Sequence, residues 1–174
     1  MRRKLILAAT LAALLCACAT KWETVNEDGF TVQMPGTPTH QTQSVDTASG
    51  KIDITLLSVE KSGEAFIVGY NEIPAAVAAM ADKDPDTFLN NARDGAVRNV
   101  NGKVTSERPV TIDGHPGKEF IGDSTSPQEA TFTARVYWVN PHLYQQLYIR
   151  PKAGSATSEN GQKFLDSFKL TAGK

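Results

Sequence analysis

Apolar and polar residues alternate along the first half of the chain, with breaks at glycine and proline. The alternation is clearest in residues 30–34, 51–59 and 64–73, and a weaker version covers residues 40–45. Strict alternation places every second side chain on one face, so it predicts half-buried β-strands. Turn residues such as Ser62-Gly63 separate these segments. We therefore expect a meander of antiparallel strands joined by short turns.

The pattern changes to a helical period after residue 84. Apolar residues recur on one helical face between Phe88 and Val100. Asp84 precedes Pro85, an arrangement typical of an N-cap followed by the first helical position. A helix is therefore predicted from Pro85 to about Val100, and the alanine-rich segment 75–81 predicts a short helix or helical turn before it.

Strand patterns return in the second half of the chain. They cover residues 103–112, 118–123, 129–139 and 143–150, and residues 158–168 predict a final helix. A tight turn is expected at residues 113–117, and Asn140-Pro141-His142 predicts another. Two main helices with six to eight mostly antiparallel strands indicate an α+β fold.

The first 18 residues are typical of an export signal. Three basic residues, Arg2 to Lys4, precede an apolar run from Leu5 to Leu15, which is too short to span a bilayer. The sequence Leu15-Cys16-Ala17-Cys18 resembles the lipobox of bacterial lipoproteins, with Cys18 as the acylated residue. The alternative is a conventional signal peptide in which both cysteines are incidental.

The signal predicts both the anchoring and the domain organisation. Residues 1–17 are expected to be removed, residues 18–28 to form a lipidated tether, and residues 29–172 to form one domain. A diacylated cysteine anchors a protein durably to a membrane. Ala19, rather than aspartate, follows Cys18, which favours the outer membrane, with the domain facing the periplasm.

Charge and cysteine content narrow the range of functions. The formal net charge is −1, and it falls to −4 when the three basic residues of the signal are removed. Nucleic-acid binding needs a basic stripe that this sequence lacks, so we expect no nucleic-acid partner. Both cysteines precede the predicted domain. Thiol chemistry and disulfides are therefore not expected in it.

Several sequence motifs together resemble those of the PsbP-like superfamily of exported bacterial proteins, which is named for a photosystem II extrinsic subunit. They are Phe30-x-Val32-x-Met34-Pro35-Gly36-x-Pro38, residues 113–120, Ala134 to Gln145, and residues 163–168. The resemblance implies an α/β/α sandwich around an antiparallel sheet. It also implies a binding or scaffold module, and it brings no catalytic residues.

No arrangement of residues predicts catalysis, a metal site or a cofactor. His40, His115 and His142 are scattered and are interpreted as solvated turn residues rather than zinc ligands. The acidic series Asp82, Asp84 and Asp86 lacks the glycine and glutamate of a calcium loop, and helix capping explains it. Ser124 and Ser126 lie outside any nucleophile elbow.

The polar face of two neighbouring predicted strands is the one candidate for a binding surface. Arg135 and Tyr137 share one side of a predicted strand, and Tyr144, Tyr148 and Arg150 share one side of the next. Tyrosine and arginine are frequent at interface hot spots, so this set is a candidate partner face. The alternative is that a helix covers the rings and completes a second layer of the fold.

Two hypotheses of function follow. The first is a lipid-anchored, non-enzymatic module that binds an envelope protein or the cell wall. The second is a periplasmic small-ligand carrier or hydrolase with a cleft between the sheet and the helices. A pocket above roughly 300 Å³ is the minimum that the second hypothesis requires.

Overall fold

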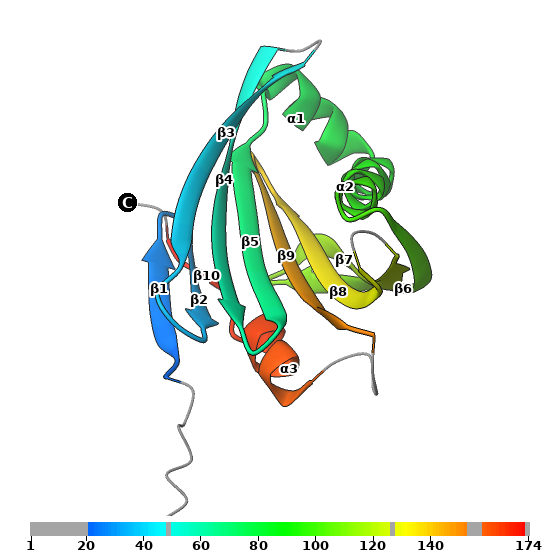
Figure 1. Cartoon of the computed structure of the whole chain (residues 1–174). Coiled ribbons are helices and arrows are strands. Elements are labelled where there is room, and N and C mark those ends of the chain that lie inside the picture. Colours follow the sequence, from blue (N-terminus) through cyan, green and yellow to red (C-terminus); the bar gives the residue numbers. More distant parts are fainter. Residues whose placement is uncertain (1–20, 48–49, 126–127, 153–157, 173–174) are drawn as a thin grey trace, which may run out of the picture.

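The computed structural model describes residues 21–47, 50–125, 128–152 and 158–172. In these ranges the chain forms three layers, namely two helices, a central sheet, and a second small sheet accompanied by one helix (Figure 1). Cys18 and the rest of the predicted signal lie outside the described residues. The α+β prediction is confirmed, and one outer layer combines strands with a helix.

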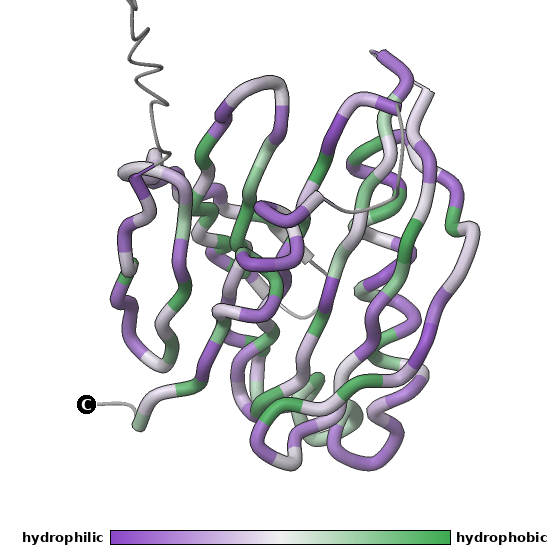
Figure 2. The backbone as a smooth tube through the Cα atoms, turned by 90° about the horizontal axis from the view of Figure 1, so that it is seen from below, coloured by the Kyte–Doolittle hydropathy of each residue, from purple (hydrophilic) through white to green (hydrophobic). Residues whose placement is uncertain are grey.

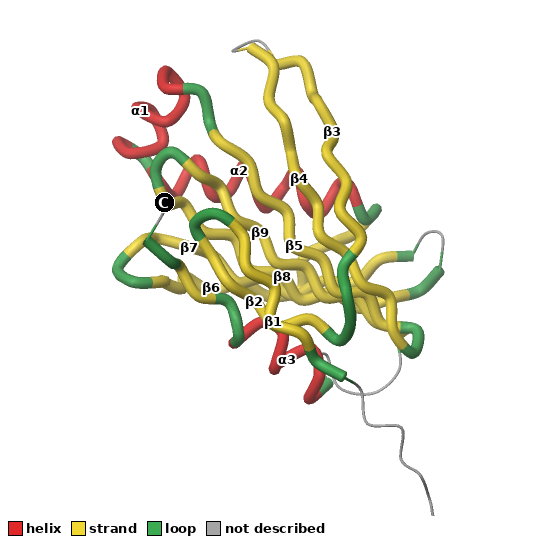
Figure 3. Tube along the Cα trace, turned by 90° about the vertical axis from the view of Figure 1, so that its left-hand side faces the viewer, coloured by secondary structure: helices red, strands yellow, loops and turns green. Residues whose placement is uncertain are grey.

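Among the described residues, the central sheet has seven antiparallel strands, within the predicted six to eight. Figure 3 shows its strands in yellow. They are β3 (Thr39–Thr47), β4 (Gly50–Lys61), β5 (Glu64–Glu72), β6 (Gly102–Ile112), β7 (His115–Ser124), β8 (Ala130–Val139) and β9 (His142–Pro151). Their order is β3-β4-β5-β9-β8-β7-β6, so β3 and β6 form the two edges. Hydrophobic and hydrophilic positions alternate along these strands (Figure 2).

The small sheet corrects one prediction. It contains β1 (Glu23–Glu27), β2 (Phe30–Met34) and β10 (Lys169–Leu170), in the order β1-β2-β10. Residues 23–27, which the sequence assigned to the tether, instead pair with β2 along their whole length. Only Val25 is apolar in this strand, so alternation was too weak to reveal it.

Within the described residues, three helices flank the sheet. These are α1 (Ala75–Lys83), α2 (Pro85–Asn99) and α3 (Glu159–Asp166). The predicted cap of α2 is confirmed, because the Thr87 backbone N–H donates to Asp84 Oδ1 at 3.1 Å. Ser158 caps α3 in the same way, accepting from the Gly161 N–H at 3.1 Å. Side-chain oxygens thus satisfy backbone donors that a helix leaves unpaired at its start.

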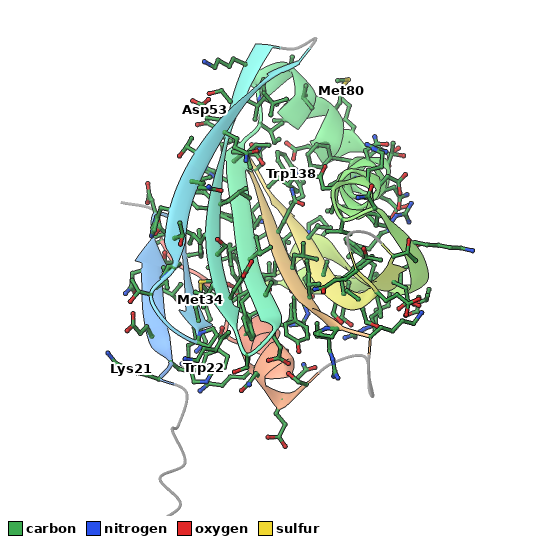
Figure 4. The ribbon with its side chains drawn as sticks, in the orientation of Figure 1. Lys21, Trp22, Met34, Asp53, Met80 and Trp138 are labelled. Carbon is green, nitrogen blue, oxygen red and sulfur yellow. The ribbon has the colours of Figure 1, made fainter. Side chains whose placement is uncertain are left out.

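Two separate cores lie on the two faces of the central sheet. On one face, α1 and α2 cover a core that includes Phe120, Phe132 and Trp138. On the other face, the small sheet and α3 cover a core rich in aromatic rings, with Phe30 and Met34 fully buried. In Figure 4, Trp138 lies on the side of α1 and Met34 lies within the small sheet. Alternation along each strand divides its side chains between these cores.

Two short turns connect neighbouring strands in the way the sequence predicts. Ser62 and Gly63 both have positive φ angles, 53° and 78°, and join β4 to β5. Asp113 and Gly114, at 48° and 84°, join β6 to β7. Two-residue turns with positive φ match the twist of a hairpin. The expected turn at residues 113–117 is therefore shorter, since β7 already begins at His115.

Candidate functional site

The predicted partner face lies largely inside the protein. Tyr137, Tyr144 and Tyr148 are buried, at 5 %, 3 % and 0 % exposure. They point into the core beneath the small sheet and α3, where Tyr148 packs on Phe66 with ring centroids 5.3 Å apart. The alternative, in which the rings complete a second layer, is the arrangement observed. The prediction that these three tyrosines form an exposed partner face is therefore wrong.

Arg135, the fourth residue of that set, holds α3 to the sheet. Its guanidinium donates to Glu119 Oε2 at 2.7 Å, to the Leu165 carbonyl at 2.9 Å and to Asp166 Oδ1 at 2.9 Å. Arg108 donates to the other oxygen of Glu119 at 2.7 Å. Burial alone would raise the pKa of Glu119, but these two arginines hold it below its usual value. Arg135 is thus a structural anchor.

Arg150, the last residue of the set, is partly exposed at the end of β9. It lines a recess of about 410 Å³ together with Glu60 to Ala65 of the β4–β5 hairpin. This recess lies at the opposite end of β5 from the hollow described next. Arg150 therefore contributes to a different surface from the one that the tyrosines define.

A larger hollow of about 750 Å³ opens at one end of the tyrosine-rich core. Its floor comes from the end of β5 and the start of β9, and its walls come from the β1–β2 turn, β4, the β6–β7 turn and the segment after β10. The backbone N–H of Thr171 donates to the Gly29 carbonyl at 3.0 Å and joins two of these walls. The volume exceeds what a small-ligand site requires.

The position of the hollow differs from the expected one. The second hypothesis places a cleft between the sheet and the helices, but this hollow lies between the central sheet and the small sheet. The recess between α2 and the sheet, lined by Ile54, Leu56 and Ala96, measures only about 120 Å³. The helix side of the sheet is therefore too closely packed there for a ligand of ordinary size.

Four carboxylates line the hollow, and they come from distant parts of the sequence. They are Asp28, Asp53, Glu72 and Asp113. Among the described lining residues there is no lysine or arginine. Figure 4 shows Asp53 on β4, toward the upper end of that strand. The lining therefore carries a negative formal charge at neutral pH, which attracts positively charged groups.

Imidazole and phenol rings form the floor between these acids. His142 stacks on Tyr144 with ring centroids 5.8 Å apart, and it pairs across the strands with Glu72. His115 lies at the start of β7, and both histidines line the hollow. Their positions in the sequence predict scattered turn residues, but the strand order places both histidines at the same hollow.

The two tyrosines of the floor are held in their neutral form. Burial, and then a 2.9 Å hydrogen bond donated to Glu27, raise the pKa of Tyr70 to about 12. Burial, and then the charge of Asp28, raise the pKa of Tyr144. Tyr70 already donates its hydroxyl to Glu27, and Tyr144 is only 3 % exposed, so the two phenols close the floor as neutral groups and leave the charge of the hollow to the carboxylates.

Gly29 allows the β1–β2 turn to pack closely against Tyr144. Its φ angle is +89°, and a Cβ atom there would lie 2.5 Å from the Tyr144 hydroxyl oxygen. Only glycine adopts this conformation without strain, and only glycine leaves room for the phenol. The β1–β2 turn can therefore rest directly on the ring.

The remaining candidates have structural roles. Asp82 accepts from the Trp138 indole N–H at 2.9 Å, and Asp86 forms an ion pair with Lys118 at 3.3 Å. Ser124 donates to the Val100 carbonyl at 2.6 Å, and Ser126 lies outside the described residues. In the described ranges, no three histidine, cysteine or acidic residues lie close enough together to hold a metal ion.

No helix within the described ranges is long and apolar enough to cross a membrane.

Comparison with known proteins supports the fold. Neither a protein-family model nor a curated protein sequence matches the chain. The solution structure of cyanobacterial PsbP (CyanoP) from Synechocystis sp. PCC 6803 matches with a TM-score of 0.55 and 14 % identity, over 94 % of this chain and all of that one. A protein of unknown function from Pseudomonas aeruginosa matches with a TM-score of 0.42 and 7 % identity, over 64 % and 84 %. The match to cyanobacterial PsbP shows that the chain has a PsbP-like fold.

Proposed function

We propose that this protein is a non-enzymatic binding module of a bacterial envelope, tethered by a lipid on Cys18, whose acidic hollow takes a positively charged ligand. The hollow is the single observation that carries the binding role. It is concave, it exceeds 300 Å³, and it combines four carboxylates with aromatic rings. A cation gains from the negative charge of the carboxylates that line the hollow.

Binding is favoured over catalysis by the arrangement of the lining. In the described residues, the imidazole of His142 is stacked on the Tyr144 ring, and neither it nor His115 forms a hydrogen bond with a hydroxyl nucleophile. A nucleophile needs an adjacent base to become reactive. The same hollow serves the small-ligand carrier of the second hypothesis, so carrier and partner-binding roles share one recognition chemistry.

Calorimetric titration with spermidine, a flexible trication, tests the binding role. Glu72→Gln and Asp113→Asn each remove one charge with little change of shape, and asparagine suits the positive φ angle at residue 113. Each should weaken binding by about two- to fivefold, the range for one solvent-exposed ion pair. Glu129→Gln, at an exposed acid outside the hollow, is the matched control.

The salt dependence of the same titration separates this proposal from an apolar pocket. Affinity for spermidine should fall as ionic strength rises, and succinate should not bind. Equal affinities of all three variants, or binding of succinate with similar strength, would refute the acidic site.

The lipid is tested separately by labelling cells with radioactive palmitate. Cys18→Ser should abolish the label and release the protein from membranes, because the anchor is the acyl group on that sulfur. Cys16→Ser is the matched control and should keep the label. Retention of label in Cys18→Ser would contradict the tether and leave the hollow unaffected.

A further inference from the structure

The two edges of the central sheet are protected to very different degrees. At one edge, β6 carries Lys103 and Pro109 and is interrupted by a register shift between Val104 and Ser106. Lysine, proline and bulges are the devices by which proteins prevent an edge strand from pairing with another chain. The β6 edge is therefore closed to strand addition.

The β3 edge has none of these devices. Its nine residues include no lysine, arginine or proline, and β3 pairs with β4 without a register shift. Thr39 to Val45 are threonine, glutamine, histidine, serine and valine, and the side chains from His40 to Val45 are exposed. The strand runs along the outside of the sheet, and the β3–β4 ribbon extends beyond its neighbours (Figures 1 and 3).

We propose that β3 pairs antiparallel with β3 of a second copy of this chain, in the register that places Thr42 opposite Thr42. A two-fold axis at Thr42 makes every cross-strand pair self-complementary. Gln41 then faces Gln43, His40 faces Ser44, and Thr39 faces Val45. Each of these is a polar or β-branched pair, and no like charges meet.

Apolar residues of β4, next to the β3 edge, also favour pairing with a second copy of this chain. Gln43 lies beside Ile54 and Gln41 lies beside Leu56 in the β3–β4 register. In the dimer, the aliphatic stems of the glutamines would therefore lie between partly exposed apolar side chains of the two copies. Apolar side chains next to a pairing edge add buried area to the backbone hydrogen bonds.

The opposite face of the edge adds polar side chains that match between the two copies. Ser44 donates to Asp53 on β4. In the proposed register, His40 of one copy faces this serine–aspartate pair of the other, and the symmetry repeats the contact. His40 also lies 3.9 Å from Glu27 of its own copy, so its imidazole would lie between polar groups of both copies. A foreign strand would have to supply this complementarity by chance.

Disulfide trapping tests the dimer in the full chain. With Cys16→Ser and Cys18→Ser, the added cysteine becomes the sole thiol. Thr42→Cys lies opposite itself in the dimer, at a separation that a disulfide can bridge. Mild oxidation should yield a linked dimer for Thr42→Cys and not for Ser106→Cys, a position on β6 that is also exposed.

A charge swap tests the register. Gln41→Lys with Gln43→Lys places lysines opposite each other twice and should reduce the Thr42→Cys cross-link by roughly fivefold or more. Gln41→Lys with Gln43→Glu creates complementary pairs and should retain it. The proposal is overturned by equal cross-linking of Thr42→Cys and Ser106→Cys, by equal yields of the two charge variants, or by trapping of another protein in place of a second copy.

Discussion

Truncation of Tyr148 distinguishes an interior tyrosine face from an exposed one. Its ring is fully buried against Phe66, and its hydroxyl bonds to Glu64 and, at 2.8 Å, to Ser158. Gly161 of α3 approaches so closely that a Cβ atom there would lie 2.5 Å from the ring. The tyrosine is thus packed by the sheet and the helix together.

The expected losses follow from these contacts. Tyr148→Phe removes two hydrogen bonds of the hydroxyl, one of them to a carboxylate, and should cost about 1–3 kcal/mol. Tyr148→Ala also removes a buried ring and should cost about 3–5 kcal/mol. Domains of this size are stable by only about 5–15 kcal/mol, so the alanine variant should be close to unfolding.

Urea denaturation followed by tryptophan fluorescence and circular dichroism measures both free energies of unfolding. Met80→Ala, at a residue 62 % exposed on α1, is the control and should change stability by about 0.5 kcal/mol or less. A Tyr148→Ala variant as stable as the control would refute the interior position of the ring.

Three further predictions concern the charge network, the wall of the hollow and the phenols. Because the pKa of Glu119 is lowered in the fold, its ionised form stabilises the native state above its unfolded pKa, and that contribution is lost as the pH falls below about 4. The melting temperature of Glu119→Gln should therefore be lower at pH 7 and should fall less steeply with acid; parallel curves would contradict the network. Gly29→Ala should destabilise the fold by about 1–3 kcal/mol, more than Gly114→Ala, where a Cβ atom meets nothing within 4 Å; equal losses in urea denaturation would argue against the close contact with the phenol. In an ultraviolet titration, Tyr70 and Tyr148 should ionise near pH 12, and stability should be lost as the pH rises from about 10 to 12; ionisation of all tyrosines near pH 10 in the folded protein would refute their burial.

Local patterns in the sequence predict much of the fold because hairpins are determined by neighbouring residues. Alternation identifies the strands around Leu57 and Val136, and Asp84-Pro85 identifies the start of α2. Where alternation is weak, as around Val25, the strand is missed. The short pair Lys169–Leu170 is likewise too brief to produce a pattern.

The candidate site depends on contacts between distant segments, which local patterns do not encode. Alternation indicates that Tyr137 and Tyr144 share a face, but only the position of the small sheet shows that the face is covered. The carboxylates of the hollow, such as Asp28 and Asp113, are 85 residues apart in the sequence and are joined by the strand order. The location of Asp113 at a predicted turn is the one signal that the sequence offered.

Binding of a cation in the hollow is the central claim, and the imidazole proton signals of the protein test it most directly. The chain has three histidines, of which His115 and His142 line the hollow and His40 does not. During an NMR titration with spermidine, the first two signals should shift along one saturating curve, and His40 should move little. Equal, linear drift of all three signals would contradict the proposed site.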